Sequence, residues 1–236
     1  MPQQILCLGE AHVPLVFAID TAAFAEAELQ DLNEHMSSFF ERLQRTPKFS
    51  QRLELCVVVG DSADALLQFA PVLRQQAPLL QVASTANIAQ SITLAIESIQ
   101  ERMEEYEQWG VPCQRPLLVL VAGDSLVQET TDALEQALRR ILEEGEKNQL
   151  RFLFAPLPGL DDDMLHTIPA RILSLFPGHS AAFFEALYTY LLLVFEGREA
   201  DAFQTGNTVL PVTEEDDNIN ASVILDKPND NAEIIT

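Results

Sequence analysis

Residues 117–121 read Leu-Leu-Val-Leu-Val, a run of apolar residues without a polar position between them. A strand with one solvated face alternates apolar and polar residues, whereas a parallel strand covered by helices on both faces is apolar throughout. Parallel neighbours also need long crossover connections, which are usually helices. This run therefore predicts the central strand of a mostly parallel sheet with helices on both faces.

The rest of the chain alternates further short apolar runs with helical patterns. Strands are predicted at 15–19, 53–59, 152–155 and 171–175. Apolar residues spaced by three and four predict amphipathic helices between them, and their positions lie within 25–43, about 85–108 and 134–142. The helix predicted at 180–195 is apolar nearly all round, so we expect most of it to be buried.

The segment 65–72 is ambiguous between a short helix and a strand. The alternation of Leu67 and Phe69, with Pro71 after them, favours an antiparallel edge strand beside 53–59. From residue 199 onward the composition shifts to nine acidic residues against Lys227. We therefore expect an α/β domain over 1–198 and a disordered acidic tail over 199–236. Short apolar stretches at 208–210 and 222–225 fit either a solubilising tail or strands added to the sheet of a partner.

The charge balance limits the classes of partner. Fourteen Lys and Arg against 36 Asp and Glu give a net charge of −22. Nucleic acids and anionic membranes repel such a surface, so we expect neither as a partner; a protein or a metal ion fits better. Cys7, Cys56 and Cys113 show no metal or disulfide spacing, and no secretory signal or spanning segment is evident. The sequence therefore favours a cytoplasmic protein.

Polar residues follow two of the predicted strands, and a third polar pair precedes the second long helix. These are Asp20-Thr21, Ser84-Thr85 and Gly123-Asp124. Because functional sites of open parallel sheets lie beyond the carboxyl ends of the strands, these side chains could meet and hold a hard divalent cation. The same residues are also ordinary turn and capping residues, and their spacing alone favours capping.

The order of elements and these motifs resemble the von Willebrand factor A (VWA) domains, especially the bacterial cytosolic type associated with tellurium resistance and stress. In that family Asp-x-Ser-x-Ser, a Thr and Thr-Asp-Gly form a metal-ion-dependent adhesion site for Mg²⁺. Residues 15–20, 84–86 and 117–124 resemble those segments, and Phe183-Phe184 resembles the final helix. The resemblance covers roughly residues 10 to 198. It implies a VWA-like Rossmannoid three-layer sandwich with one antiparallel edge strand.

The chain departs from the family where the metal would bind. Ala22 and Phe24 stand where the family has two Ser ligands, and Asp124 is shifted by one position relative to Thr-Asp-Gly. Only Asp20 and Thr85 match cleanly. We therefore expect a degenerate site in which Asp20, Thr85 and Asp124 bind Mg²⁺ weakly or not at all. Phe24 is expected to place an apolar group on the binding face, which suits a protein contact.

A serine esterase of the GDSL (SGNH) type is the alternative function. Gly123-Asp124-Ser125-Leu126 spells its nucleophile block, and Asp163 with His166 spells its Asp-x-x-His block. Against it, the block lies more than a hundred residues from the N-terminus, and the blocks that supply the oxyanion hole are not found. No glycine-rich nucleotide-binding loop is present in the sequence either.

These observations favour a non-enzymatic adaptor that binds protein partners over the carboxyl ends of its strands. The resemblance suggests a kinase, phosphatase or ATPase of the same stress or defence system, and no cofactor beyond weakly held Mg²⁺. The residues expected to contact the partner are Asp20, Thr21, Ala22, Ala23, Phe24, Ser84, Thr85 and Asp124.

Overall fold

The computed structural model describes residues 10–60, 64–85, 87–123, 131–147, 149–157, 171–172 and 179–198 of the 236-residue chain. The strands are β1 Val13–Ile19, β2 Leu53–Val59, β3 Leu67–Pro71, β4 Leu117–Ala122, β5 Arg151–Pro156 and β6 Arg171–Ile172. The helices are α1 Glu26–Arg45, α2 Pro47–Ser50, α3 Ile88–Trp109, α5 Thr131–Glu146 and α7 Ser180–Glu196, with 3-10 turns η1 Thr21–Ala23 and η2 Val72–Arg74. The predicted tail at 199–236 lies outside the described residues.

The six strands form one sheet in the order β3-β2-β1-β4-β5-β6. All neighbouring pairs are parallel except β2 and β3, which are antiparallel. The predicted fold class is therefore confirmed, and so is the edge strand favoured for 65–72. Every residue of β4 is buried, as expected for a central strand that is covered on both faces.

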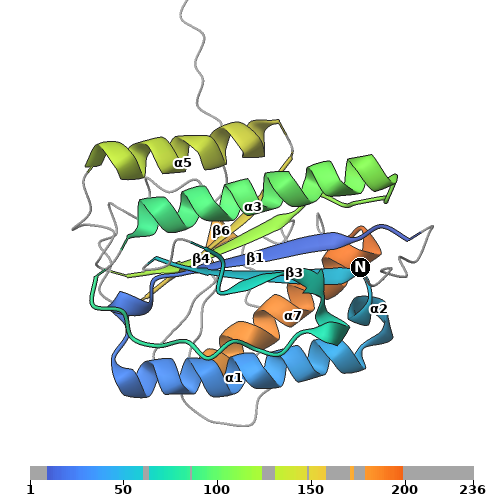
Figure 1. Ribbon diagram of the computed structural model, residues 1–236. Coiled ribbons are helices and arrows are strands. Elements are labelled where there is room, and N and C mark those ends of the chain that lie inside the picture. The colour runs from blue at the N-terminus through green and yellow to red at the C-terminus, as the bar shows by residue number, and fades with distance from the viewer. Residues whose placement is uncertain are drawn as a thin grey trace, which may run out of the picture.

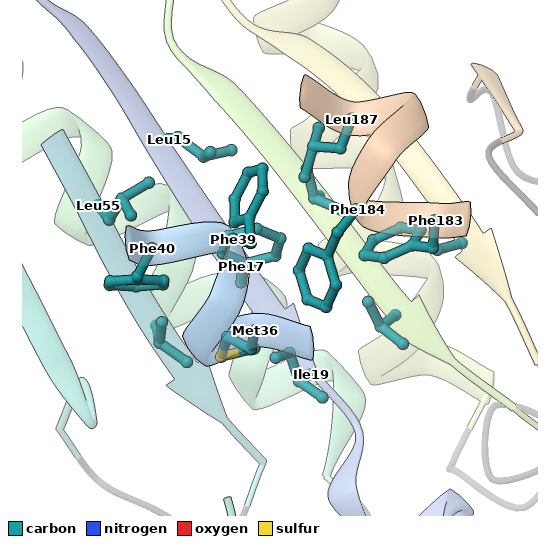
Figure 2. Packing of buried hydrophobic residues seen from close by; sticks show 14 of the residues in the cluster. Leu15, Phe17, Ile19, Met36, Phe39, Phe40, Leu55, Phe183, Phe184 and Leu187 are labelled. Carbon is teal, nitrogen blue, oxygen red and sulfur yellow. The ribbon is translucent and has the colours of Figure 1, made fainter. Parts of the chain in front are cut away.

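Helices cover both faces of the sheet, with α1 and α7 on one side and α3 and α5 on the other (Figure 1). The twofold alternation of β1 sends Phe17 and Ile19 into the first core cluster and Val16 and Ala18 into the second. On the α1 and α7 face, the ring of Phe39 lies 6.4 Å from Phe17 and 4.9 Å from Phe184 (Figure 2). These aromatic contacts join a strand to two helices that are distant in sequence.

The second long helix begins later than predicted. It was expected from about residue 85, but α3 starts at Ile88 because the side chain of Asn87 caps it by accepting from the amide of Gln90. The helix ends at Gly110, whose φ of 64° lies in the left-handed region that glycine adopts most easily. As a result, Thr85 lies in the segment before the helix rather than in its first turn.

A bulge interrupts the pairing of β2 with β3 between Leu55 and Val57. The buried side chain of Gln75 donates to the carbonyl oxygens of Leu55 at 2.6 Å and Gln68 at 2.9 Å. Gln75 therefore satisfies backbone groups that a regular ladder would have paired. It fixes the chain where η2 leaves the edge of the sheet.

None of the helices among the described residues is both long and apolar enough to cross a membrane.

Candidate functional site

The carboxyl ends of the parallel strands line up along one edge of the sheet. In the register, Ile19 of β1 lies opposite Val59 of β2 and Val121 of β4. The segments that follow these strands therefore begin side by side. This carboxyl edge is where the sequence predicted the binding site.

Asp20 lies at the centre of the carboxyl edge and is almost fully buried. Its amide donates to the carbonyl of Val121 at 2.8 Å, and its Oδ1 accepts from the amide of Ala22 at 3.1 Å. The carboxylate thus serves as the N-cap of η1. This is the capping role that the spacing alone favoured.

Gly123, the residue that follows β4, packs closely against apolar groups of two neighbouring segments. A Cβ placed on Gly123 would come within 3.0 Å of Ala23 Cβ and 3.3 Å of Leu157 Cβ. Gly123 therefore packs tightly between η1 and Leu157, the residue that follows β5. The atoms nearest to this Cβ position are carbons of Ala23 and Leu157, which cannot ligate Mg²⁺.

The expectation for Phe24 is wrong. Its side chain is only 7% exposed and belongs to the first core cluster, so it does not present an apolar group on the binding face. The turn η1 directs it inward because burial of an aromatic ring is favourable. Thr21 is also buried, while Ala22 and Ala23 are half-buried.

The predicted residues that precede α3 lie at the surface. Ser84 and Thr85 are both exposed, just before the N-cap Asn87. Asn87 itself packs against the end of β2, where a Cβ on Gly60 would lie 3.0 Å from its backbone nitrogen and oxygen. Asp124 lies outside the described residues, so the position of this predicted ligand is not part of the geometry.

The described part of the chain contains no group of three or more His, Cys, Asp or Glu side chains arranged to hold a metal ion. Ser125 and His166, the residues of the alternative esterase, fall outside the described residues. Nothing in the structure or in the comparisons below supports that alternative.

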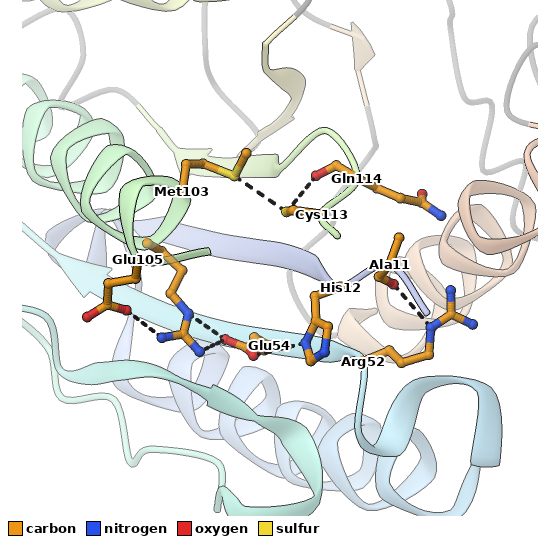
Figure 3. Close-up of polar contacts among 9 residues, drawn as sticks. Ala11, His12, Arg52, Glu54, Met103, Glu105, Cys113 and Gln114 are labelled. Atoms are coloured by element: carbon orange, nitrogen blue, oxygen red, sulfur yellow. Dashed lines mark hydrogen bonds and ion pairs between the residues drawn. The ribbon is translucent and has the colours of Figure 1, made fainter. Parts of the chain in front are cut away.

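Sequence reasoning missed a buried ionic cluster at the opposite edge of the sheet. Glu54 of β2 is fully buried and accepts from Arg102 of α3, with Oε2 lying 2.7 Å from Nε and 2.6 Å from Nη2 (Figure 3). Its Oε1 lies 3.1 Å from Nδ1 of His12, which is also buried. The signal in the sequence was a lone Glu within the otherwise apolar run 53–59. A buried charge of this kind requires a partner.

The cluster keeps both groups charged despite their burial. Burial alone would raise the pKa of Glu54, but the hydrogen bond with His12 and the charge of Arg102 outweigh it, so the pKa lies below its ordinary value. Burial alone would lower the pKa of Arg102, but Glu54 reverses that effect and raises it. The cluster therefore holds α3 against β2 at the amino edge, the edge of the sheet where the parallel strands begin. It is a structural ion pair that is closed to solvent.

Cys113, a half-buried free cysteine, lies near this cluster. Its Sγ contacts Met103 Sδ at 3.4 Å and the carbonyl of Gln114 at 3.0 Å. Burial, with a smaller effect from Glu54, raises the pKa of this thiol to about 12. A thiol with such a pKa is protonated at neutral pH and therefore unreactive.

Comparisons with known proteins concern the fold. No protein-family model matches the chain, and no curated protein matches it. The solved structures similar to it include the PilB minor pilin from Streptococcus sanguinis, with 10% identity and a TM-score of 0.50 over 80% of this chain and 62% of that chain. The chain thus spans less than two thirds of the length of PilB.

Two further similar structures are single domains, and the alignment covers nearly the whole of each. The vWF domain of the type V pili tip protein Mfa5 from Porphyromonas gingivalis matches with 10% identity and a TM-score of 0.47, over 79% of this chain and 97% of that one. The TFIIH p34 N-terminal domain matches with 10% identity and a TM-score of 0.48, over 75% and 96%. The strand order, the antiparallel edge and the helices on both faces define a VWA-like α/β domain.

Proposed function

We propose that this protein is a non-enzymatic adaptor that binds a protein partner over the carboxyl edge without a divalent metal ion. The observation that carries the proposal is that the Asp20 carboxylate caps η1, while Gly123 packs closely against Ala23 and Leu157. In a VWA domain with a working metal site, the ion supplies the contact with the partner. Here that contact has to come from the protein surface itself.

Of the predicted contact residues that the structure describes, Ser84 and Thr85 are the exposed ones. They offer hydroxyl groups that donate and accept hydrogen bonds, and the half-buried Ala22 and Ala23 of η1 offer a small apolar area. Asp20, Thr21 and Phe24 are buried, so their role in this proposal is to shape the edge.

The resemblance to VWA domains suggests the kind of system in which the adaptor works. The bacterial cytosolic members are associated with tellurium resistance and stress, and kinases, phosphatases and ATPases accompany them. We infer a partner of this kind in the cytosol, within a stress or defence system. The net charge of −22 favours a partner with a basic contact surface.

The test is affinity capture by the immobilised full chain from an extract of its host, in Mg²⁺ and in EDTA, with bound proteins identified by mass spectrometry. We expect the same partner in both conditions. Thr85→Lys should weaken its binding at least about tenfold, since it places a large cation on the contact surface. Ser37→Lys, at an exposed position on α1, is the matched control and should bind like the wild type.

Three results would contradict the proposal. Loss of the partner in EDTA alone would show that an ion site works after all. Equal binding by Thr85→Lys and the wild type would show that the partner does not bind at the carboxyl edge. Turnover of p-nitrophenyl acetate that Ser125→Ala removes would show an esterase.

A further inference from the structure

Among the described residues, β3 is the last strand in the sheet order and pairs with β2 alone, so no described strand pairs with its outer edge. Residues 66–73 read Leu-Leu-Gln-Phe-Ala-Pro-Val-Leu and contain no charged residue. This is notable in a chain with 36 acidic residues. Edge strands of monomeric proteins usually carry charges that prevent pairing with another chain.

Exposed apolar side chains lie at both ends of this strand and in the segment that follows it in sequence. Leu66 and Leu73 flank it, with 45% and 50% of their surface exposed. Leu79 and Val82 are exposed in the segment that follows, where two hydrogen bonds between Asn33 of α1 and the backbone of Leu80 hold the chain. Of the six exposed large hydrophobic residues among those described, these make four. The concentration indicates an interaction surface.

The charges at the two ends of the uncharged stretch favour a particular occupant. Asp64 precedes it and Arg74 follows it, and both are exposed. An antiparallel pairing of β3 with a second copy, centred near Phe69, brings Asp64 of one chain towards Arg74 of the partner subunit and the reverse. The strand is thus complementary to itself about a twofold axis. A parallel pairing would instead place like charges together.

The net charge supports the same occupant. Two chains of charge −22 repel each other over most of their surfaces, so they can approach closely only where the surface is uncharged. A basic partner would need acidic groups along the edge, and 66–73 offers none. The bulge at Leu55/Val57 and Pro71 shorten the part of the edge that can pair with another strand. Residues 67–70 remain for such pairing.

We propose that two copies of this chain dimerise by antiparallel pairing of their β3 edges, which continues the sheet across a twofold axis. This surface is distinct from the carboxyl edge, and the proposal does not depend on the proposed function. A partner captured through Thr85 leaves it untouched. A dimer formed through β3 would neither support nor contradict the proposed adaptor function.

The test is the mass of the full chain by sedimentation velocity over a roughly hundredfold range of concentration. We expect a rise from the 26.2 kDa of one chain towards twice that mass. Added salt should strengthen the dimer, because it screens the repulsion between two acidic chains. A contact with a basic partner would weaken with salt.

Substitutions locate the interface. Leu66→Lys should raise the dissociation constant of the dimer at least about tenfold, while Leu142→Lys, at an exposed leucine on α5, should not change it. Arg74→Asp should weaken the dimer about fivefold, as expected for an exposed ion pair, and the double swap Asp64→Arg/Arg74→Asp should restore it. Far-ultraviolet circular dichroism checks that each variant is folded.

A single-chain mass at every concentration and salt level would overturn the proposal. So would a dimer that Leu66→Lys and Arg74→Asp leave unchanged, or one that Leu142→Lys disrupts equally. Failure of the double swap to restore a dimer lost in Arg74→Asp would refute the antiparallel register.

Discussion

Replacing Glu54 by Gln tests whether the buried ionic cluster holds α3 against the sheet. The substitution keeps the shape of the side chain but removes the charge that faces Arg102. Arg102 is only 6% exposed and cannot lose its proton, so its charge stays buried with weaker compensation. The contacts that lose their charge are the two between Glu54 Oε2 and Arg102, at 2.7 and 2.6 Å.

Removing one partner of a buried ion pair costs about 3–5 kcal/mol. Glu105 also pairs with Arg102, but its side chain is 46% exposed and it provides partial compensation. We therefore expect a loss near the lower end, about 3 kcal/mol in the free energy of unfolding. For a domain of this size, that corresponds to a fall in Tm of roughly 6–12 °C.

The assay is equilibrium unfolding in urea, followed by circular dichroism and by tryptophan fluorescence. Trp109 is the only tryptophan in the chain, and the guanidinium of Arg102 lies 5.6 Å from its ring centroid. Its emission therefore reports on the environment of the cluster itself. Circular dichroism reports on the whole fold.

Two controls make the result specific. Glu105→Gln removes a half-exposed carboxylate from the same Arg102 and should cost less than about 1 kcal/mol. The double variant Glu54→Leu/Arg102→Met removes both charges and should be more stable than Glu54→Gln. Equal losses for Glu54→Gln and Glu105→Gln would refute the reasoning, as would a double variant that is no more stable than the single one.

Three further predictions follow from the same structure. The pKa of Glu54 in the folded chain lies below its ordinary value of 4.5. The contribution of Glu54 to stability is therefore complete above pH 4.5 and is lost as the pH falls through the folded pKa. Urea titrations below pH 4.5 should show the wild type losing stability faster than Glu54→Gln, and parallel losses would contradict this. Gly123→Ala should cost about 1–3 kcal/mol in thermal unfolding because its Cβ would lie 3.0 Å from that of Ala23, and an unchanged Tm would show that the carboxyl edge is looser than described. Gln75→Ala should cost about 1–3 kcal/mol because it leaves the carbonyls of Leu55 and Gln68 without a donor; hydrogen exchange should rise in β3 first, and exchange unchanged there would rule out this role.

The sequence could predict the class of the fold because the signals are local. An apolar run such as 117–121 has to be covered on both faces wherever it lies, and the three-and-four spacing that follows it allows only a helix. Pro71 and the alternation before it marked the edge strand correctly. Helix ends were less certain, because Asn87 and Ser84 can both cap a helix and packing selected Asn87.

The candidate site was predicted only as a location. The sequence placed Asp20, Thr85 and their neighbours beyond the carboxyl ends of the strands, and the register confirms that the strand ends line up there. It could not tell that Phe24 turns inward, because the direction of the side chain that follows η1 depends on the space that α1 and the sheet leave for it. Exposure is a property of the whole packed domain.

What the sequence by itself determined is the order of elements, the covered faces of the sheet and the charge of the surface, since each follows from composition and period along the chain. Only the tertiary structure decided which polar groups meet. Glu54 and Arg102 are 48 residues apart, and they pair because β2 and α3 pack together at the amino edge. Asp20 caps a turn because the backbone of η1 brings the amide of Ala22 to its carboxylate, and Gly123 packs against Ala23 and Leu157 beyond it in the sequence. Such contacts depend on distances in space, which a linear pattern does not contain.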